Sequence, residues 1–409
     1  MVLKCRLSRS FSPMNCNKDS VNHELNLYFD NSATSWPKPE AVYRAAELQM
    51  RQMCGNPGRS GHTRMLEADR LIYRTREALA ALFKVDDPSR IIFALNATDA
   101  LNIALKGFLK TGDHVIFTAL EHNSVLRPLG TMRRNGLITT TMLPCSLEGY
   151  PDLEFLENAY QPQTSLLVIN HASNVIGTVA PLRKMIESAH KKGVKVLVDA
   201  AQTAGTIDID IADLDIDLLA FTGHKSLLGP TGTGGLYVKV GIDLKPLREG
   251  GTGSHSEIDL HPESMPERLE AGTLNSAGLA GLLEGINFIR ETGLDQIREH
   301  ETALRRSLRE QLMEMRQITV YGPEEAAECA GSLSFTIRDT DCGEIGYILE
   351  NNFGILCRTG LHCAPLAHQA FGTFPGGTIR LSPGFFTKAG DIQFLINAIR
   401  EIVALTEKG

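Results

Sequence analysis

The sequence has few cysteines, and their spacing is not that of a metal site or a disulfide framework. The eight cysteines among 409 residues stand at positions 5, 16, 54, 145, 329, 342, 357 and 363, and no two of them form a CxxC pair. Neither a disulfide-stabilised module nor a cysteine-rich zinc site is therefore indicated. We expect no metal, and a reducing cytoplasm as the location.

Long apolar runs and an excess of positive charge are also absent. No stretch approaches the roughly 18 apolar residues of a membrane span, and the uncharged run from Ser226 to Val238 is interrupted by glycine and proline. With 41 basic against 48 acidic residues, the net charge of −7 provides no basic field for nucleic acid or anionic lipid. We expect a small-molecule substrate, and neither nucleic acid nor membrane as a partner.

The length and composition are those of an ordinary globular protein. Apolar residues make up 43% and charged residues 22% of the chain. At roughly 150 residues per domain, this length predicts two or three domains. The first 18 residues carry four basic side chains and no acid, as transit peptides and disordered tails both do. We predict a disordered tail over residues 1–26.

Residues 27–265 alternate short β-rich runs with segments of helical periodicity. The β-rich runs are IIFAL (91–95), HVIFTAL (114–120), SLLVIN (165–170), KVLVDAA (195–201), DLLAF (217–221) and GLYVKV (235–240). Several are apolar throughout, as strands covered on both faces are. They predict a large α/β domain with a mostly parallel, doubly wound sheet.

A polar stretch, residues 249–266, ends this pattern and marks the expected domain junction. A long helical region (277–317), the runs SLSFTIR (332–338), ILCRT (355–359) and TIRLS (378–382), and a last helix (388–406) follow. Residues 266–409 are therefore predicted to form a smaller α+β domain. The segment at the N-terminus is a candidate to pack with it.

Chemically reactive side chains follow the predicted strands of the large domain, where open parallel sheets bind ligands. They are Asn96, Ala97 and Thr98 after the first run, His122 after the second, Asn174 after the third, Asp199 and Gln202 at the fourth, and Thr222, His224 and Lys225 after the fifth. This shared position predicts one binding site.

Lys225 and Asp199 suggest a cofactor only when they are taken together. An isolated loop lysine usually reaches solvent, and an acid after a strand is often a helix cap. An aldehyde cofactor with a pyridinium ring, however, needs a lysine to hold the aldehyde and an acid to keep the ring nitrogen protonated. Asn96 to Thr98 would open a helix whose free N–H groups suit the cofactor phosphate, a role compatible with a plain N-cap at Thr98. The phosphate-loop pattern GxxxxGK[ST] is not present.

From Tyr28 to its end, the chain closely resembles the cysteine desulfurase and selenocysteine lyase branch of the class V aminotransferases. The strings that carry the resemblance are EHNS, HASNVIGTVAPL, VLVDAAQTAG, FTGHKSLLGPTGTGGLYV, RLEAGTLN and RTGLHCAPLA, in this order. The resemblance implies a homodimeric enzyme of fold type I that binds pyridoxal 5'-phosphate.

The resemblance also implies the roles of individual residues. The cofactor would be bound by Ala97 through its backbone N–H, Thr98, His122 stacked on the ring, Asn174, Asp199 at the ring nitrogen, Gln202 at the ring oxygen, Thr222, His224, Lys225 at the aldehyde, and Thr273 from the other subunit. Asn174 and Arg380, with Arg358 in second place, would bind the substrate carboxylate. A structural ion pair is the alternative for both arginines, and an ordinary loop position is the alternative for Thr273. Ala97 departs from the family pattern, which often has a hydroxyl there.

Cys363 is the residue that would take sulfur. It lies in a loop punctuated by glycine and proline, beside His362 and near Arg358, where a thiolate would be both stabilised and exposed. Lys225, Cys363 and His122 would then be catalytic. The implied reaction removes sulfur from L-cysteine, or selenium from selenocysteine, releases L-alanine and leaves a persulfide on Cys363 for a sulfur-acceptor protein.

Two further hypotheses remain at the level of sequence. One is a class V aminotransferase, or another C–S lyase, in which Cys363 is not the sulfur acceptor. The other is a non-catalytic scaffold that keeps the fold, against which the intact Lys225, Asp199 and His122 argue. Alanine formed together with a bound persulfide, rather than a keto acid, would distinguish a desulfurase from an aminotransferase.

Overall fold

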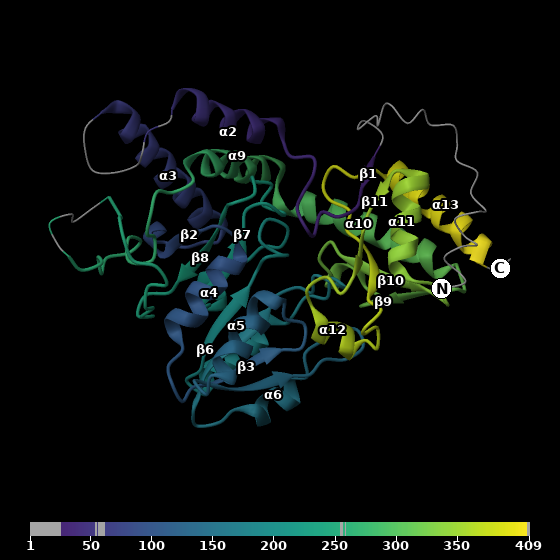
Figure 1. Ribbon diagram of the computed structural model, residues 1–409, viewed down its shortest axis with the longest axis horizontal. Coiled ribbons are helices and arrows are strands. Elements are labelled where there is room, and N and C mark those ends of the chain that lie inside the picture. Colours follow the sequence, from purple (N-terminus) through teal and green to yellow (C-terminus); the bar gives the residue numbers. More distant parts are fainter. Residues whose placement is uncertain (1–25, 54, 56–61, 254–256, 258, 407–409) are drawn as a thin grey trace.

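Seven strands form the large sheet, in the spatial order β2-β8-β7-β6-β5-β3-β4 (Figure 1). Their bounds are β2 (Ile91–Ala94), β3 (His114–Thr118), β4 (Thr139–Leu143), β5 (Thr164–Asn170), β6 (Lys195–Asp199), β7 (Leu218–Thr222) and β8 (Gly234–Val238). Strand β8 is antiparallel to both of its neighbours, and the other neighbours are parallel. The predicted mostly parallel sheet is confirmed. Strand β4 was not predicted, because its threonines give an edge strand without an apolar run.

Helices cover both faces of this sheet. The helices of this domain are α2 (Glu40–Gln52), α3 (Thr63–Leu82), α4 (Ala97–Phe108), α5 (Asn123–Arg134), α6 (Leu153–Ala159), α7 (Leu182–Lys191), α8 (Ile211–Leu214) and α9 (Ser276–Thr292), with a 3-10 turn η2 (Pro88–Arg90). Helix α2 packs on the outer side of α9 (Figure 1). Successive strand side chains point to opposite faces, so Leu167 and Ile169 join the core under α3, α7 and α9. Leu166 and Val168 join the core under α4 and α5. Burial on both faces explains the uninterrupted apolar runs.

The second domain, green to yellow in Figure 1, contains a four-stranded antiparallel sheet in the order β12-β13-β10-β9. Its elements are α10 (Leu294–Met313), β9 (Ile318–Tyr321), η3 (Ala326–Glu328), β10 (Leu333–Ile337), α11 (Cys342–Phe353), β11 (Ile355–Leu356), β12 (Arg358–Gly360), α12 (Pro365–Ala370), β13 (Thr378–Leu381) and α13 (Ala389–Thr406). Helices α10, α11 and α13 enclose its apolar core with the sheet.

The first described strand, β1 (Leu27–Tyr28), pairs in parallel with β11 of the second domain. Phe29 is fully buried in that domain's core. Residues 27–35 therefore pass along the small domain before the chain enters the large one. Ser32 and Ala33 of this segment then line a cavity together with residues of both sheets.

The structure, a computed structural model, describes residues 26–53, 55, 62–253, 257 and 259–406. The prediction of a tail over residues 1–26 falls almost entirely outside this part. The predicted division after residue 265 stays a prediction. By its packing, α9 belongs with the large domain, since its apolar side chains join the core below the large sheet. No described helix is both long and apolar enough to cross a lipid bilayer.

Candidate active site

A cavity of about 260 Å³ opens at the carboxyl edge of the large sheet. It brings together most of the residues predicted from the sequence: Ala97, Thr98, His122, Asn174, Asp199, Gln202, Thr222, His224, Lys225, Arg358 and Arg380. Because the strands that precede these residues in the large domain end at one edge, their following side chains converge there. Cys363 lies beside the cavity without lining it, and Thr273 lies elsewhere.

The start of α4 forms one wall of the cavity. Asn96 is its N-cap, and the side chain of Asn96 accepts a hydrogen bond from the Asp99 N–H. A Cβ at Gly234 would lie 2.7 Å from the Asn96 Cα, so only glycine allows β8 to approach this turn. Thr98 Oγ1 lies 2.7 Å from Ser124 Oγ at the start of α5. Free N–H groups and hydroxyls therefore gather where a phosphate would bind.

Lys225 and Asp199 are the buried charges at the centre of the cavity. Burial lowers the pKa of Lys225 to about 8, although the charge of Asp199 opposes this shift. Burial raises the pKa of Asp199, which the hydrogen bond from the Ala201 N–H and the charge of Lys225 oppose. Within the described chain, the Lys225 amine forms no ion pair within 4.0 Å. A substantial fraction of this amine is therefore neutral and nucleophilic near pH 8.

His122 caps the N-terminus of α5 and is held by its own helix. Its Nδ1 accepts a hydrogen bond from the Ser124 N–H and lies 2.7 Å from Ser124 Oγ. Since Nδ1 is an acceptor, the ring proton resides on Nε2. Burial, followed by the charges of Lys225 and Arg358, lowers the pKa of His122 to about 4. The imidazole is thus neutral at physiological pH, as a ring that stacks on a cofactor should be.

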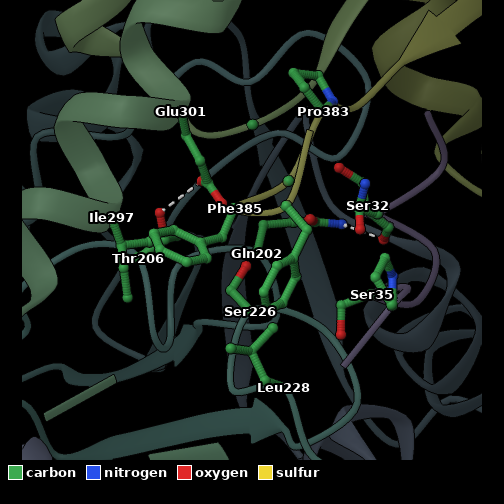
Figure 2. Close-up of a pocket in the computed structure, with 15 residues that line it drawn as sticks. Ser32, Ser35, Gln202, Thr206, Ser226, Leu228, Ile297, Glu301, Pro383 and Phe385 are labelled. Carbon is green, nitrogen blue, oxygen red and sulfur yellow. Dashed lines mark hydrogen bonds between the residues drawn. The ribbon is translucent and has the colours of Figure 1, made fainter. Parts of the chain in front are cut away.

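Gln202 lines both this cavity and a smaller one, whose lining side chains are drawn in Figure 2. The Gln202 amide donates to the Ser32 carbonyl at 3.1 Å, and both residues line both cavities. The smaller cavity, about 30 Å³, is large enough for about two water molecules. It also contains Glu301, whose carboxylate accepts a hydrogen bond from Thr206 and whose pKa burial raises to about 7.

The two predicted carboxylate-binding arginines lie directly opposite each other on neighbouring strands. Arg358 of β12 pairs with Arg380 of β13 in the antiparallel register. Arg380 donates to the Asn174 carbonyl at 2.9 Å and forms an ion pair with Asp30. Arg380 therefore forms the structural ion pair that was the alternative, and it also lines the cavity. In the described chain its Nε has no hydrogen-bond partner.

Cys363 is held by its loop rather than by its side chain. The Cys363 carbonyl accepts from the Asn123 N–H at 2.8 Å, and the His362 carbonyl accepts from the Asn174 amide at 2.6 Å. Arg358 Nη2 lies 3.8 Å from Cys363 Sγ. Burial lowers the pKa of His362 to about 2. His362 is therefore neutral, which leaves Arg358 as the adjacent cation that can stabilise a thiolate.

Thr273 is exposed and lines a separate cavity of about 260 Å³ with Arg248 and Glu270. It makes no contact with the cavity of Lys225 in the same chain. Its predicted role at the other subunit's phosphate stays a prediction.

Four polar residues that line the cavity were not predicted as ligand-binding residues: Ser32, Ser124, Asn170 and His362. Ser124 follows His122 by two residues, so the strand-end pattern carried a signal for it. Ser32 comes from the segment after β1, which no rule about parallel strands links to this edge.

The cavity has the polar atoms that pyridoxal phosphate needs. Within the described residues, five of its buried polar atoms have no hydrogen-bond partner: Thr222 Oγ1, His224 Nδ1, Asn174 Oδ1, His362 Nδ1 and Arg380 Nε. Most buried polar atoms have a hydrogen-bond partner, so a group of five unpaired atoms at one cavity indicates a ligand site. A lysine of lowered pKa, a buried acid, a neutral histidine and a helix N-terminus complete the set. This fold and site define a pyridoxal-phosphate enzyme of fold type I.

Comparison with known proteins identifies the family. The model of the aminotransferase class-V family matches residues 27–395. A probable cysteine desulfurase of Methanothermobacter thermautotrophicus is 32% identical over 93% of this chain and 95% of its own. A cysteine desulfurase of Enterobacter sp. is 31% identical over 92% and 94%. The chain belongs to the class-V aminotransferase family, which uses pyridoxal phosphate, and the resemblance seen in the sequence is confirmed.

Solved structures agree with this assignment. The apo structure of a cysteine desulfurase from Thermococcus onnurineus has a TM-score of 0.87 at 30% identity, over 93% of this chain and 95% of that one. A cysteine desulfurase from Escherichia coli in an S-sulfonic acid form has a TM-score of 0.85 at 28% identity, over 93% and 96%.

Proposed function

We propose that the protein is a pyridoxal-phosphate-dependent cysteine desulfurase that converts L-cysteine to L-alanine and carries the sulfur away as a persulfide on Cys363. The observation that carries this proposal is the place of Cys363 beside the Lys225 cavity, with its sulfur 3.8 Å from Arg358 Nη2. An aminotransferase has no need for a thiol at this position. The names of the relatives support the same activity.

Binding and orientation fall to the walls of the cavity. Lys225 would hold the cofactor aldehyde, Asp199 the ring nitrogen, Gln202 the ring oxygen and His122 one face of the ring. Phosphate would be bound by Thr98, Thr222, His224 and the N–H groups at the start of α4. Bound pyridoxal phosphate supplies an electron sink that stabilises negative charge on the substrate α-carbon.

Proton and sulfur transfer then depend on Lys225 and Cys363. The Lys225 amine, whose pKa is about 8, takes the α-proton of the substrate and can return it. The Cys363 thiolate attacks the substrate sulfur, so that an S–S bond forms as the Cβ–S bond breaks. The electron pair of the broken bond stays on carbon, which gains a proton and leaves as L-alanine. One L-cysteine thus yields one L-alanine and one Cys363 persulfide.

The substrate carboxylate would bind at Arg380 and Asn174. Arg380 combines a buried charge with an unpaired Nε, and such a guanidinium prefers a planar anion. Arg358 would interact mainly with the Cys363 thiolate and only secondarily with the substrate carboxylate, because it is the cation next to that sulfur. Selenocysteine presents the same carboxylate and a leaving group at the same carbon, so it would enter the same reaction.

The active unit would be a homodimer. Helices α2, α3 and α9 enclose a surface cavity of about 560 Å³, and Leu48 and Tyr73 expose large apolar side chains there. Thr273 lies on the exposed segment just before α9, where a neighbouring subunit would approach it. These features support the dimer. The sulfur-acceptor protein and the cytoplasmic location stay predictions.

The test uses the holoenzyme and L-cysteine. Mass spectrometry of the peptide containing Cys363 should show one added sulfur, and alanine should form in the same reaction. Cys363→Ala should bind cofactor normally but release alanine at least about 100-fold more slowly. Cys145→Ala, at a half-buried thiol, is the matched control and should react like the unsubstituted protein.

Other products point to another reaction. A keto acid without alanine, or normal alanine release by Cys363→Ala, would establish the alternative in which Cys363 is not the acceptor.

A further inference from the structure

Asp30 is a charged residue close to the substrate site that does not line its cavity. It follows β1, and its backbone is tied to the end of β13: the Asn31 N–H donates to the Ser382 carbonyl and the Ser382 N–H to the Phe29 carbonyl. Tyr28 Oη donates to the Asp30 carbonyl at 3.1 Å. The main chain of Asp30 therefore has one fixed position beside β13.

The Asp30 carboxylate contacts one group at this site, the guanidinium of Arg380. The Arg380 side chain is 1% exposed, whereas that of Asp30 is 22% exposed. Arg380 also donates to the Asn174 carbonyl. Two of the five guanidinium N–H donors are thus engaged. Nε is among those that remain, and it is buried without a partner in the described chain.

Arg380 would not keep this orientation by itself. Its cross-strand partner is Arg358, and like charges directly opposite each other on a sheet repel. A long side chain with free rotamers would turn its guanidinium away from Arg358. Asp30, approaching from the N-terminal segment, offsets this repulsion and fixes the Nη2 end of the guanidinium.

We propose that Asp30 is a positioning residue for substrate recognition: it holds Arg380 so that the Nε edge of the guanidinium is presented to the carboxylate of an amino-acid substrate. The inference rests on the proposed function, because it assigns Arg380 to the substrate carboxylate. Asp30 itself touches neither substrate nor cofactor.

The test compares two substitutions and two ligands. Asp30→Asn keeps an oxygen that accepts from Nη2, so its KM for L-cysteine should stay within about 5-fold. Asp30→Ala removes the acceptor, so KM should rise about 10- to 100-fold while kcat changes less than about 3-fold. Glu314→Ala, which breaks an exposed ion pair with Arg400 in the same domain, is the matched control and should change neither constant.

A binding measurement distinguishes a specific loss of carboxylate binding at Arg380 from a general loss of structure in the site. The holoenzyme is titrated with L-alanine, which has the carboxylate, and with cysteamine, which lacks it, and binding is followed by cofactor absorbance. Asp30→Ala should weaken L-alanine about 10-fold or more and leave cysteamine unchanged. Equal weakening of both ligands, or an unchanged KM for L-cysteine, overturns the proposal.

The same data distinguish failure of the proposed function. A holoenzyme that forms no persulfide from L-cysteine, yet binds L-alanine in a manner that depends on Asp30, disproves the desulfurase and leaves the role of Asp30 in place.

Discussion

Two buried arginines in this protein, Arg76 and Arg380, are bonded in different ways. Arg76 of α3 donates to both carboxylate oxygens of Glu270, at 2.8 and 2.9 Å, and also to the Ile91 carbonyl. Its guanidinium lies 4.5 Å from the centre of the Phe93 ring. Both members of the pair are nearly inaccessible, at 5% and 6% exposure. The chain itself provides every contact that this cation needs.

Arg380 is equally buried but has fewer partners. It has one contact with Asp30 and one with Asn174, and its Nε is unpaired in the described chain. Thr222 and His224 in the same cavity also carry unpaired atoms. Removing one member of a buried ion pair whose partners all lie within the chain destabilises the fold, whereas charges with unpaired atoms at a cavity are free to bind a ligand.

The largest effect is expected at Lys225. Lys225→Ala should lower desulfurase turnover at least about 10⁴-fold, because no other group at the cavity can hold the cofactor aldehyde. The protein should also lose the visible absorbance of the lysine-bound cofactor. Lys184→Ala, at an exposed position on α7, is the control and should keep both. Retention of turnover and absorbance by Lys225→Ala would remove Lys225 from the mechanism.

The next prediction substitutes the two arginines by methionine. Arg76→Met should lower the free energy of unfolding by about 3 to 5 kcal/mol, because it leaves the inaccessible Glu270 carboxylate without its cation. Arg380→Met should change it by less than about 1 kcal/mol, because the Asp30 carboxylate is accessible enough to be hydrated. Chemical denaturation of both cofactor-free proteins measures the difference.

The loss of activity should be larger for Arg380→Met than for Arg76→Met, the reverse of the loss of stability. Arg380→Met should lower kcat/KM for L-cysteine about 100-fold, whereas the folded fraction of Arg76→Met should react almost normally. If both substitutions cost the same stability, the distinction between the two arginines fails.

The sequence predicted the parts of this site that depend on parallel strands. Lys225, Asp199 and His122 each follow a strand of the large sheet, and strands of one direction end at one edge. The contribution of Asp30 could not be predicted, because it lies 350 residues from Arg380 and reaches it through the pairing of β1 with β11 and the bridge from Asp30 to Ser382. The sequence offered two alternative roles for Arg380, a structural ion pair or a binding site for the substrate carboxylate. In the structure Arg380 forms an ion pair with Asp30 and also lines the cavity, so the two roles do not exclude each other.

Glu121 is a third kind of buried ionisable group, since among the described residues it has no paired cation and it does not line the cavity. Its Oε1 accepts from Thr118 Oγ1 and from the Asn170 N–H, both at 2.7 Å, while Oε2 is unpaired in the described residues. Burial, together with the charge of Asp199, raises the pKa of Glu121 to about 8. The native protein therefore binds a proton here that the unfolded chain releases near its ordinary pKa of 4.5.

The smallest effect is expected from Glu121→Gln. Between the unfolded and the folded pKa, the native state holds the extra proton, so the stability contributed by Glu121 falls as pH rises. Glutamine keeps the acceptor oxygen but does not titrate. As pH rises, the free energy of unfolding of the variant should therefore increase relative to that of the unsubstituted protein by about 1.4 kcal/mol per pH unit, or about 2 kcal/mol between about pH 6 and pH 7.5. The group at Glu301 titrates in the same range, but it is present in both proteins and cancels in the difference. Denaturation of the cofactor-free proteins across this range measures the gain, and the exposed Glu401→Gln should show none. A difference that does not change with pH would mean that Glu121 is already ionised in the folded protein.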